Sequence, residues 1–236
     1  MTLTARAIRA RLRSHAIPAN VAILQRFFKT GRGEYGEGDR FIGVKVPGLR
    51  AVCRECRDVS FEVVLDLLHS RIHEERLLAL LLLVDAFERG DDATRRRVYD
   101  TYLANTAFIN NWDLVDASAA QIVGGWLQSR SRAPLVRLAK SRSLWERRIA
   151  IVATFYYIRR DELDDTFRIS DLLLKDEHDL IHKAVGWMLR EAGKRDGAAL
   201  RRFLAPRYQT MPRTMLRYAI ERFGAVERKR YLLGQV

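Results

Sequence analysis

The sequence predicts an all-α fold, an α-α superhelix (solenoid) of HEAT-like helical hairpin repeats with a concave basic face. Apolar residues recur with a period near 3.6 along nearly the whole chain, while the period-2 alternation of strands is almost absent. A helix of one pattern also returns about every 35 residues. With 236 residues, 48% of them hydrophobic, the chain can bury an ample core. We therefore expect one repeat domain over residues 1–236.

The repeat is visible when similar segments are aligned. Residues 75–79 have the same pattern as residues 146–150, which lie 71 positions later. The midpoint between these two segments falls at residues 111–116. The pattern returns at residues 181–185 and 215–219, after offsets of 35 and 34. Each segment begins with polar or basic residues, enters an apolar stretch and follows a shorter predicted helix. This arrangement is typical of stacked helical hairpins, although the period is slightly short for HEAT repeats.

Capping and helix-breaking residues support the predicted boundaries. Ser143 and Glu146 have the spacing of a capping box, and Ser60 suits an N-cap position. Gly90 is expected to end a helix, and Pro212 suits a first turn. In chain order, the helices are predicted over residues 4–15, 18–29, 47–57, 61–69, 73–89, 92–105, 111–123, 132–140, 144–159, 163–175, 178–194, 197–205, 212–223 and 225–233.

The charge balance points to a polyanionic partner. The chain has 42 Lys and Arg against 29 Asp and Glu, a formal net charge of +13. Such a balance favours nucleic acid or an anionic membrane face. The longest apolar run, residues 77–84, is far shorter than the roughly 20 residues that a membrane span needs. We therefore expect no membrane span, and nucleic acid and an anionic membrane face both stay open as partners at this point.

Cysteine content and the N-terminal residues bear on the compartment. Only two cysteines are present, which excludes a disulfide-rich secreted scaffold and suits a reducing compartment. The N-terminus is rich in arginine and has no acid before Glu34, a feature shared with mitochondrial transit peptides. A first amphipathic helix with a basic surface accounts for the same residues and is favoured. We expect a cytoplasmic protein.

Equivalent positions in stacked repeats are expected to align along one face. A concave row of cations fits a phosphate backbone, which is contacted at regular spacing. Solvated surface residues of a repeat protein would show the same pattern, and this alternative stays open. The row is predicted to contain Arg76, Trp112, Arg147 or Arg148, His182 or Lys183, and Arg217.

A glycine-rich segment matches the sequence motif of a dinucleotide-binding loop but not its predicted structural context. Residues 31–36 match G-x-G-x-x-G, but no strand is predicted before them and no helix directly after them. Nearby acids would also repel a pyrophosphate: Glu34, Glu37 and Asp39. We expect residues 30–40 to form a long flexible loop between helices.

The candidate metal ligands are incomplete sets. Cys53 and Cys56 have metal-type spacing but lack a second pair. Two histidine pairs are four residues apart and would need further ligands, so surface histidines are the favoured interpretation: His69 with His73, and His178 with His182. We expect no metal and no cofactor.

One group of residues suggests chemistry. Trp112 and Asp116 are four residues apart and share one face of a helix. Trp187 lies two repeats later, with space beside it at Gly186, and Arg148 lies on the repeat between them. Two indoles, a carboxylate and an arginine on successive repeat helices could hold a sugar or a base and stabilise a cation. A packed core with one capping aspartate would fit the same residues.

These residues resemble the AlkD family of HEAT-like DNA glycosylases. The resemblance implies functional roles for Trp112, Asp116, Arg148 and Trp187. Phe27 departs from the tyrosine of some members, which puts in doubt a polar DNA contact near the N-terminus. The resemblance is carried by Phe41-Ile-Gly-Val-Lys-Val-Pro47 with Arg50, Asn111-Trp112-Asp113-Leu114-Val115-Asp116, Trp145-Glu146-Arg147-Arg148-Ile149-Ala150 and Lys183-Ala184-Val185-Gly186-Trp187-Met188-Leu189-Arg190.

The activity that the resemblance implies is release of N3- and N7-alkylated purines from duplex DNA, without a base-flipping pocket. A cationic purine leaves readily, so one carboxylate, Asp116, would suffice to stabilise the sugar cation and position water. Trp112 and Trp187 would cradle the deoxyribose, and Arg148 would anchor a phosphate. Asp113 is expected to support the start of the helix.

With this resemblance, we expect the partner to be double-stranded DNA carrying alkylated purines such as 3-methyladenine and 7-methylguanine. We expect it to be bound by a monomer that has no membrane association and that associates with the nucleoid through DNA. The DNA-binding residues are expected to be Arg148, Arg147, Lys183, Arg76 and Arg217. Three alternatives stay open. Lys183 could support Schiff-base lyase chemistry, the chain could be a non-catalytic HEAT-like module that binds duplex or branched DNA, or it could be a protein-binding adaptor.

Overall fold

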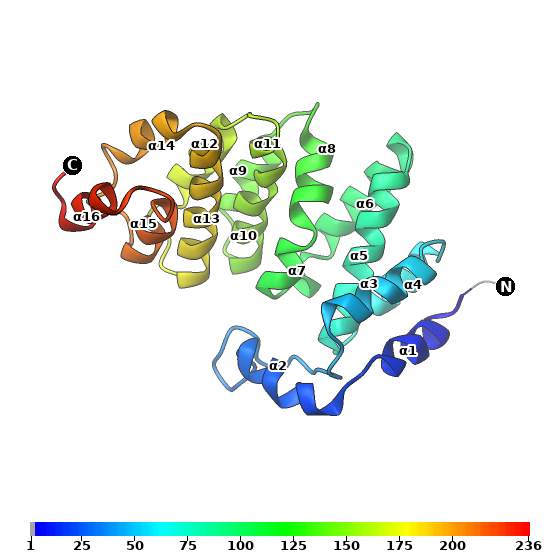
Figure 1. The fold of residues 1–236 in the computed structure, drawn as a ribbon. Helices are drawn as coiled ribbons and strands as arrows, with labels where there is room; N and C mark the ends of the chain where they lie inside the picture. The colour runs from blue at the N-terminus through cyan, green and yellow to red at the C-terminus, as the bar shows by residue number, and fades with distance from the viewer. Residues whose placement is uncertain (1–2) are drawn as a thin grey trace. The chain divides into compact units, whose positions relative to one another are not determined.

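A computed structural model describes residues 3–236, and within them the chain forms helices, turns and one isolated parallel bridge between Arg40 and Ile72. The predicted all-α fold is confirmed (Figure 1). The chain groups into two compact units, which divide between Ser118 and Ala119. That residues 1–236 form a single domain stays a prediction.

The first unit is built around one long helix. Helix α5 packs against α3, α4, α6 and α7. Its residues Leu77–Leu83 are all buried, because this stretch is apolar on every face of the helix. The elements of this unit are α1 (Ala5–Ser14), η1 (Pro18–Asn20), α2 (Val21–Phe27), α3 (Val46–Glu55), α4 (Phe61–Leu68), α5 (His73–Arg89), α6 (Asp92–Ala104), η2 (Thr106–Phe108) and α7 (Trp112–Asp116).

The second unit contains the stacked repeats. Its elements are η3 (Ala120–Gly124, a π-helical segment), α8 (Gly125–Leu127), α9 (Ala133–Ala139), α10 (Leu144–Ala153), α11 (Phe155–Ile158), α12 (Asp164–Leu172), α13 (Asp179–Arg195), α14 (Gly197–Leu204), α15 (Arg213–Ala219) and α16 (Ala225–Leu233). Helix α10 packs on α13, and α13 packs on α15 (Figure 1). The pattern that recurs near residues 146, 181 and 215 therefore marks three successive stacked helices.

Two predicted helices are interrupted. The helix predicted over 111–123 ends at Asp116, and the one predicted over 144–159 breaks at Thr154. At both breaks a hydroxyl donates to an earlier carbonyl. Ser118 Oγ lies 2.6 Å from the Leu114 oxygen, and Thr154 Oγ1 lies 2.7 Å from the Ile151 oxygen. Such local bonds compete with regular helical geometry.

The helix ends follow the sequence signals in part. The Ser143 hydroxyl accepts a bond from the Glu146 backbone nitrogen at 3.4 Å, as the capping box predicts. Gly90 caps α5, and Ser60 precedes α4 without a side-chain capping bond. Pro212 is the N-cap of α15 rather than a first-turn residue. Across residues 3–236, no helix combines the length and apolar character that crossing a bilayer would require.

Candidate functional site

Helix α7 carries the two residues at the centre of the sequence prediction. Its apolar side is anchored by Leu114 and Val115, which are fully buried. Asn111 caps the start, because its side-chain oxygen accepts from the Trp112 backbone nitrogen at 2.8 Å. Trp112 and Asp116 are half-buried. The helix therefore presents an indole and a carboxylate that are neither core residues nor fully solvated.

The Trp112 indole is held by aromatic rings at the end of α2. It stacks on Phe28, with centroids 5.3 Å apart and planes at 23°. Phe27 meets it edge-on at 5.7 Å. Phe28 is buried and stacks in turn on Phe41 at 5.2 Å, whereas Phe27 is 60% exposed. These rings fix one face of the Trp112 indole. Phe27, which stands where some AlkD-family members have tyrosine, contributes a ring contact there.

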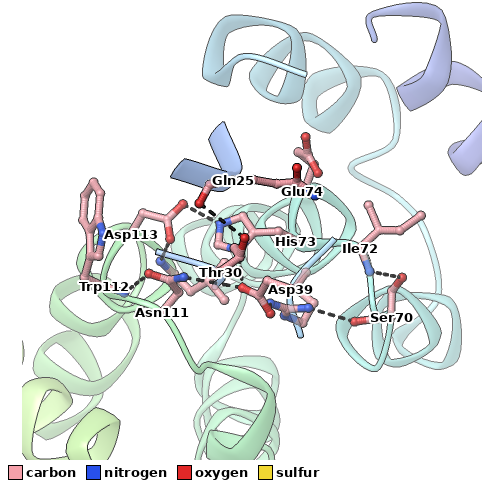
Figure 2. Close-up of polar contacts among 12 residues, drawn as sticks. Gln25, Thr30, Asp39, Ser70, Ile72, His73, Glu74, Asn111, Trp112 and Asp113 are labelled. Atoms are coloured by element: carbon pink, nitrogen blue, oxygen red, sulfur yellow. Dashed lines mark hydrogen bonds and ion pairs between the residues drawn. The ribbon is translucent and has the colours of Figure 1, made fainter. Parts of the chain in front are cut away.

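A buried polar network connects the start of α7 with His73 of α5 and with Asp39 (Figure 2). His73 Nδ1 lies 3.0 Å from an Asp39 carboxylate oxygen, and His73 Nε2 lies 2.8 Å from Asp113 Oδ2. Arg76 donates to the other Asp39 oxygen at 2.7 Å. Asn111 Nδ2 donates to Asp39 at 3.4 Å. We call these five residues the His73 network; it joins residues 30–40, the start of α5 and the start of α7.

The network favours the cationic form of His73. Burial lowers the pKa of the His73 imidazole, but the hydrogen bonds to Asp113 and Asp39 outweigh burial, and the pKa is raised above the usual 6.5. Burial raises the pKa of the Asp39 carboxyl, but His73 and Arg76 outweigh it, and the pKa is lowered. Because both ring nitrogens face carboxylate oxygens, both must donate, which requires the doubly protonated ring.

Two sequence expectations are corrected here. His73 was expected at the surface, yet it is 1% exposed. Arg76 was expected in an exposed row of DNA-binding cations, yet it is 4% exposed and is bonded to Asp39 and to the Ser70 carbonyl, the latter at 3.0 Å. The physical reason is that α5 is buried on all sides from its first turn. The apolar run at residues 77–84 could have revealed this, because the first turn of such a helix is buried too.

Glu74, the residue after His73, explains the conformation of the Phe41-Ile-Gly-Val segment. Its buried carboxylate accepts hydrogen bonds from the backbone nitrogens of Ile42 at 3.1 Å, Gly43 at 2.8 Å and Val44 at 3.2 Å. Gly43 has a φ of 88°, and a Cβ there would collide with the Ile17 carbonyl. Only glycine fits this turn. Sequence reasoning did not identify the role of Glu74.

Residues 30–40 form a run of turns between α2 and α3, as expected for a loop, and several of its acidic residues bond within the segment. Glu34 and Glu37 accept hydrogen bonds from the backbone nitrogens of Gly31 and Gly33, each at 2.8 Å. Asp39 joins the His73 network at the end of the segment. The acids therefore fold the segment on itself. No strand precedes the glycines and no helix begins directly after them, so this part of the chain lacks the strand-loop-helix context of a dinucleotide site.

The candidate metal ligands form no complete set in the described part of the chain. Cys53 and Cys56 are buried free cysteines. His178 caps the start of α13, where its Nδ1 accepts from the Leu180 backbone nitrogen at 3.1 Å, so this histidine has a local structural role. Among residues 3–236, no three His, Cys, Asp or Glu side chains gather in a way that could hold a metal ion.

In the second unit, the arginines of α10 join it to the start of α13. Arg148 is 5% exposed, and its Nη1 donates to the Leu180 carbonyl at 2.7 Å. Arg147 forms an ion pair with Asp176, with Nε 2.6 Å from the carboxylate oxygen. Both guanidinium groups are therefore oriented by residues near the N-terminus of the next repeat helix.

Trp187 is half-buried on α13, and its ring centroid lies 5.8 Å from that of Phe155. The space that the sequence suggested beside it at Gly186 is filled by α15. A Cβ on Gly186 would lie 2.5 Å from Tyr218 Cβ and 2.6 Å from the Met215 carbonyl oxygen. Gly186 therefore permits close helix packing and does not create an open pocket.

Two further predicted DNA contacts share a polar cavity of about 450 Å³ beside α13, α15 and α16. Lys183 forms an ion pair with Asp179 at 2.7 Å and is partly exposed. Arg217 is exposed. The cavity is also lined by Arg228 and Glu221, so its lining is basic overall but contains two acids.

The comparisons with known proteins agree with this architecture. The family of DNA alkylation repair enzymes matches residues 8–223. The chain belongs to this family. A solved structure described as a predicted DNA alkylation repair enzyme from Enterococcus faecalis is similar with a TM-score of 0.68 and 16% identity, over 89% of this chain and 98% of that one. At this identity the likeness shows the fold alone, which is the predicted helical repeat. No curated protein matches the chain.

Membership of the DNA alkylation repair enzyme family supports enzyme status and a role in the repair of alkylation damage. It agrees with the resemblance to the AlkD family that four segments of the sequence carried. Family membership does not assign roles to individual residues.

Proposed function

We propose that this DNA alkylation repair family member is a monofunctional DNA glycosylase. Its substrates are cationic N3- and N7-alkylated purines, such as 3-methyladenine and 7-methylguanine, in duplex DNA, and it acts without a base-flipping pocket. One observation carries the proposal: α7 presents Trp112 and Asp116 half-buried, on a helix whose start is fixed by a charged network.

The reaction exchanges one bond for another at the sugar C1′. The bond from the sugar C1′ to the purine nitrogen breaks, and its electron pair neutralises the cationic purine. Positive charge develops on the deoxyribose, as in glycoside hydrolysis. Water then bonds to C1′ and loses a proton to solvent. Because the leaving purine is already cationic, no general acid is needed, and the Asp116 carboxylate stabilises the sugar cation and orients the water.

The aromatic and basic residues supply binding. Phe28 supports one side of the Trp112 ring, and the electron-rich faces of indoles attract cationic groups. We assign Trp187 the same task on α13. Arg148, Arg147, Lys183 and Arg217 are proposed to contact the DNA backbone, where arginine suits the planar geometry of phosphate. Arg76 is not included, because both of its Nη nitrogens donate hydrogen bonds within the first unit, to the Ser70 carbonyl and to Asp39.

The test is base release from a methylated duplex, followed by chromatography of the freed purine. We expect wild-type protein to release 7-methylguanine and 3-methyladenine. Asp116→Asn should lower the rate by about 100-fold or more while DNA affinity stays within about threefold. Asp100→Asn, which removes an exposed carboxylate on α6, is the matched control and should release base at the wild-type rate.

The outcomes separate the alternatives. Duplex binding without base release would favour a non-catalytic DNA-binding module. Borohydride trapping of the protein on DNA would indicate Schiff-base chemistry at Lys183, and we expect none. If Asp116→Asn releases base as fast as wild type, Asp116 does not have the assigned role.

A further inference from the structure

We propose that His73 is a positioning residue. Its imidazolium, held between Asp39 and Asp113, fixes the first turn of α7 and with it the orientation of Trp112 and Asp116. The catalytic consequence rests on the proposed glycosylase function, while the positioning itself can be measured without that function.

The length of α7 makes an external anchor necessary. The regular part of α7 has five residues before the helical geometry changes at Ala117, so few hydrogen bonds of its own fix its first turn. Leu114 and Val115 hold its apolar side. On its polar side, the contact to α5 is the 2.8 Å bond between Asp113 Oδ2 and His73 Nε2. This bond therefore sets the angle at which the first turn of α7 leaves the core.

Asp113 is well placed to pass this constraint on. It is adjacent to Trp112 and three residues before Asp116, within little more than one helical turn. A tilt of so short a helix about the Asp113 anchor would move the indole and the carboxylate together. Displacements of about 1 Å at reacting groups lower rates by as much as about 100-fold.

The charges around His73 explain why a histidine cation is needed. The charged groups that face it are Asp39 from the preceding segment, Asp113 from α7 and Arg76 from its own helix. Two carboxylates are thus balanced by two cations in a buried site. Loss of the imidazolium would leave an uncompensated carboxylate there, a strongly unfavourable arrangement. Asp113 would then turn toward water and release the first turn of α7.

A second path joins His73 to Trp112 through aromatic rings. The His73 ring stacks on Phe41, with centroids 4.6 Å apart, and lies 4.8 Å from Phe28. Phe28 in turn stacks on the Trp112 indole. The same imidazolium thus contacts the support of the indole by ring packing and the helix start by a charged hydrogen bond. These two contacts together constrain both the position and the tilt of Trp112.

The experiment uses the full chain labelled with 5-fluorotryptophan and compares wild type with His73→Gln and Asp113→Asn. Fluorine NMR reports the four indoles separately, and Trp112→Phe assigns the resonance of Trp112. Base release in single turnover and DNA affinity are measured on the same samples. The matched control is Glu75→Gln, which removes a buried carboxylate from the same helix but one that pairs with Arg9 of α1 at 2.8 Å.

We expect His73→Gln and Asp113→Asn each to shift or broaden the Trp112 resonance and to leave those of Trp126, Trp145 and Trp187 in place. Base release should fall by about 10- to 100-fold, with DNA affinity changed by less than about threefold. The double variant should be no worse than His73→Gln, because both changes break the same bond. Glu75→Gln should leave the Trp112 resonance and the rate of base release unchanged.

The positioning role is overturned if Asp113→Asn folds and its Trp112 resonance is that of wild type. It is equally overturned if Glu75→Gln moves that resonance as much as His73→Gln does, since the effect would then be general destabilisation. If His73→Gln does not fold, Asp113→Asn alone decides, because it keeps the ion pairs of Asp39. If the wild-type protein releases no base, the proposed glycosylase function is wrong. The shift of the Trp112 resonance would then still test whether His73 positions α7.

Discussion

The Phe28 ring supports the Trp112 indole from beneath, with their centroids 5.3 Å apart and their planes at 23°. Phe28 is the C-cap residue of α2, and its ring also lies 4.8 Å from His73. One buried side chain therefore contacts both the candidate sugar-binding indole and the cation beneath it. Stability and function of the first unit should both depend on this ring.

The adjacent phenylalanines provide a matched pair. Phe28→Ala should lower the free energy of unfolding by about 3 kcal/mol or more, because it opens a cavity in a packed aromatic cluster. Phe27→Ala should cost less than about 1 kcal/mol, since Phe27 is 60% exposed. Urea unfolding measures both values. Equal losses for the two variants would contradict the supporting role assigned to Phe28.

Glu74 should be one of the most sensitive carboxylates in the chain. Glu74→Gln keeps the side-chain volume but replaces an ionised acceptor of three backbone N–H groups by an amide. Hydrogen bonds to charged groups contribute about 1.5–3 kcal/mol, so a loss of about 2 kcal/mol is expected. The control is Glu62→Gln on α4, where the carboxylate is exposed beside Arg97 and little change in stability is expected. Unfolding midpoints in urea at neutral pH will show whether the two differ.

The His73 network predicts a definite pH dependence of stability. The pKa of His73 is raised above its usual 6.5, so the stability it contributes is fully present below about pH 6.5 and is lost as pH rises through the raised value. The pKa of Asp39 is lowered from 3.8, so its contribution is present above about pH 3.8 and is lost as pH falls through the lowered value. The network should therefore be strongest at mildly acidic pH.

The difference in unfolding free energy between wild type and His73→Gln isolates the histidine. It should be largest at pH 5 to 6 and should narrow as the pH is raised through the shifted value. His69→Gln is the control, because His69 is in the same unit and its Nε2 bonds to Asn105 outside the network. A difference that stays constant across the alkaline range would show that His73 does not act as a cation.

The sequence was informative wherever the signal is local or periodic. Helix α5 begins and ends where it was predicted, and α10, α13 and α15 stack as the repeats at 146, 181 and 215 implied. Trp112 and Asp116 were chosen as candidates because they lie four residues apart, on one face of the helix predicted over residues 111–123, and their roles stay a proposal. The breaks after Asp116 and at Thr154 were missed because single hydroxyls, Ser118 and Thr154, redirect the backbone within otherwise helical patterns.

The His73 network was missed for a different reason. Its members are separated by 34 and 40 residues along the chain, and no periodicity relates a turn residue to two helix starts. His73 was weighed with His69 as an incomplete metal pair, and Arg76 was placed in a basic row by its repeat position. Both inferences assumed that the first turn of this helix is solvated. Because α5 is buried from its first residue, neither holds.

Variants of Arg217 and Arg76 test which cationic side chains contact DNA. Arg217→Gln should lower the steepness of the salt dependence of duplex binding by about one unit in the log–log slope, as expected for loss of one phosphate contact. Arg76→Gln should leave that slope unchanged in folded protein and should instead lower the free energy of unfolding, because Asp39 loses a buried partner. Fluorescence anisotropy of a labelled duplex between about 50 and 200 mM salt measures the slope. A reduced slope for Arg76→Gln alone would reverse the assignment.

Gly186 provides the sharpest test of packing beside Trp187. Alanine favours a helix over glycine by about 1 kcal/mol, so propensity alone predicts that Gly186→Ala stabilises α13. A Cβ there would lie 2.5 Å from Tyr218 Cβ and 2.6 Å from the Met215 carbonyl oxygen, and the helices would have to separate. Overpacking of this kind costs about 1–3 kcal/mol, so the variant should be less stable than wild type and should release base more slowly as Trp187 shifts. Gly197→Ala is the control, since its Cβ would meet only the flexible end of Arg201 at 3.1 Å. Stability of Gly186→Ala at or above that of wild type in urea unfolding would show that α13 and α15 do not pack this closely.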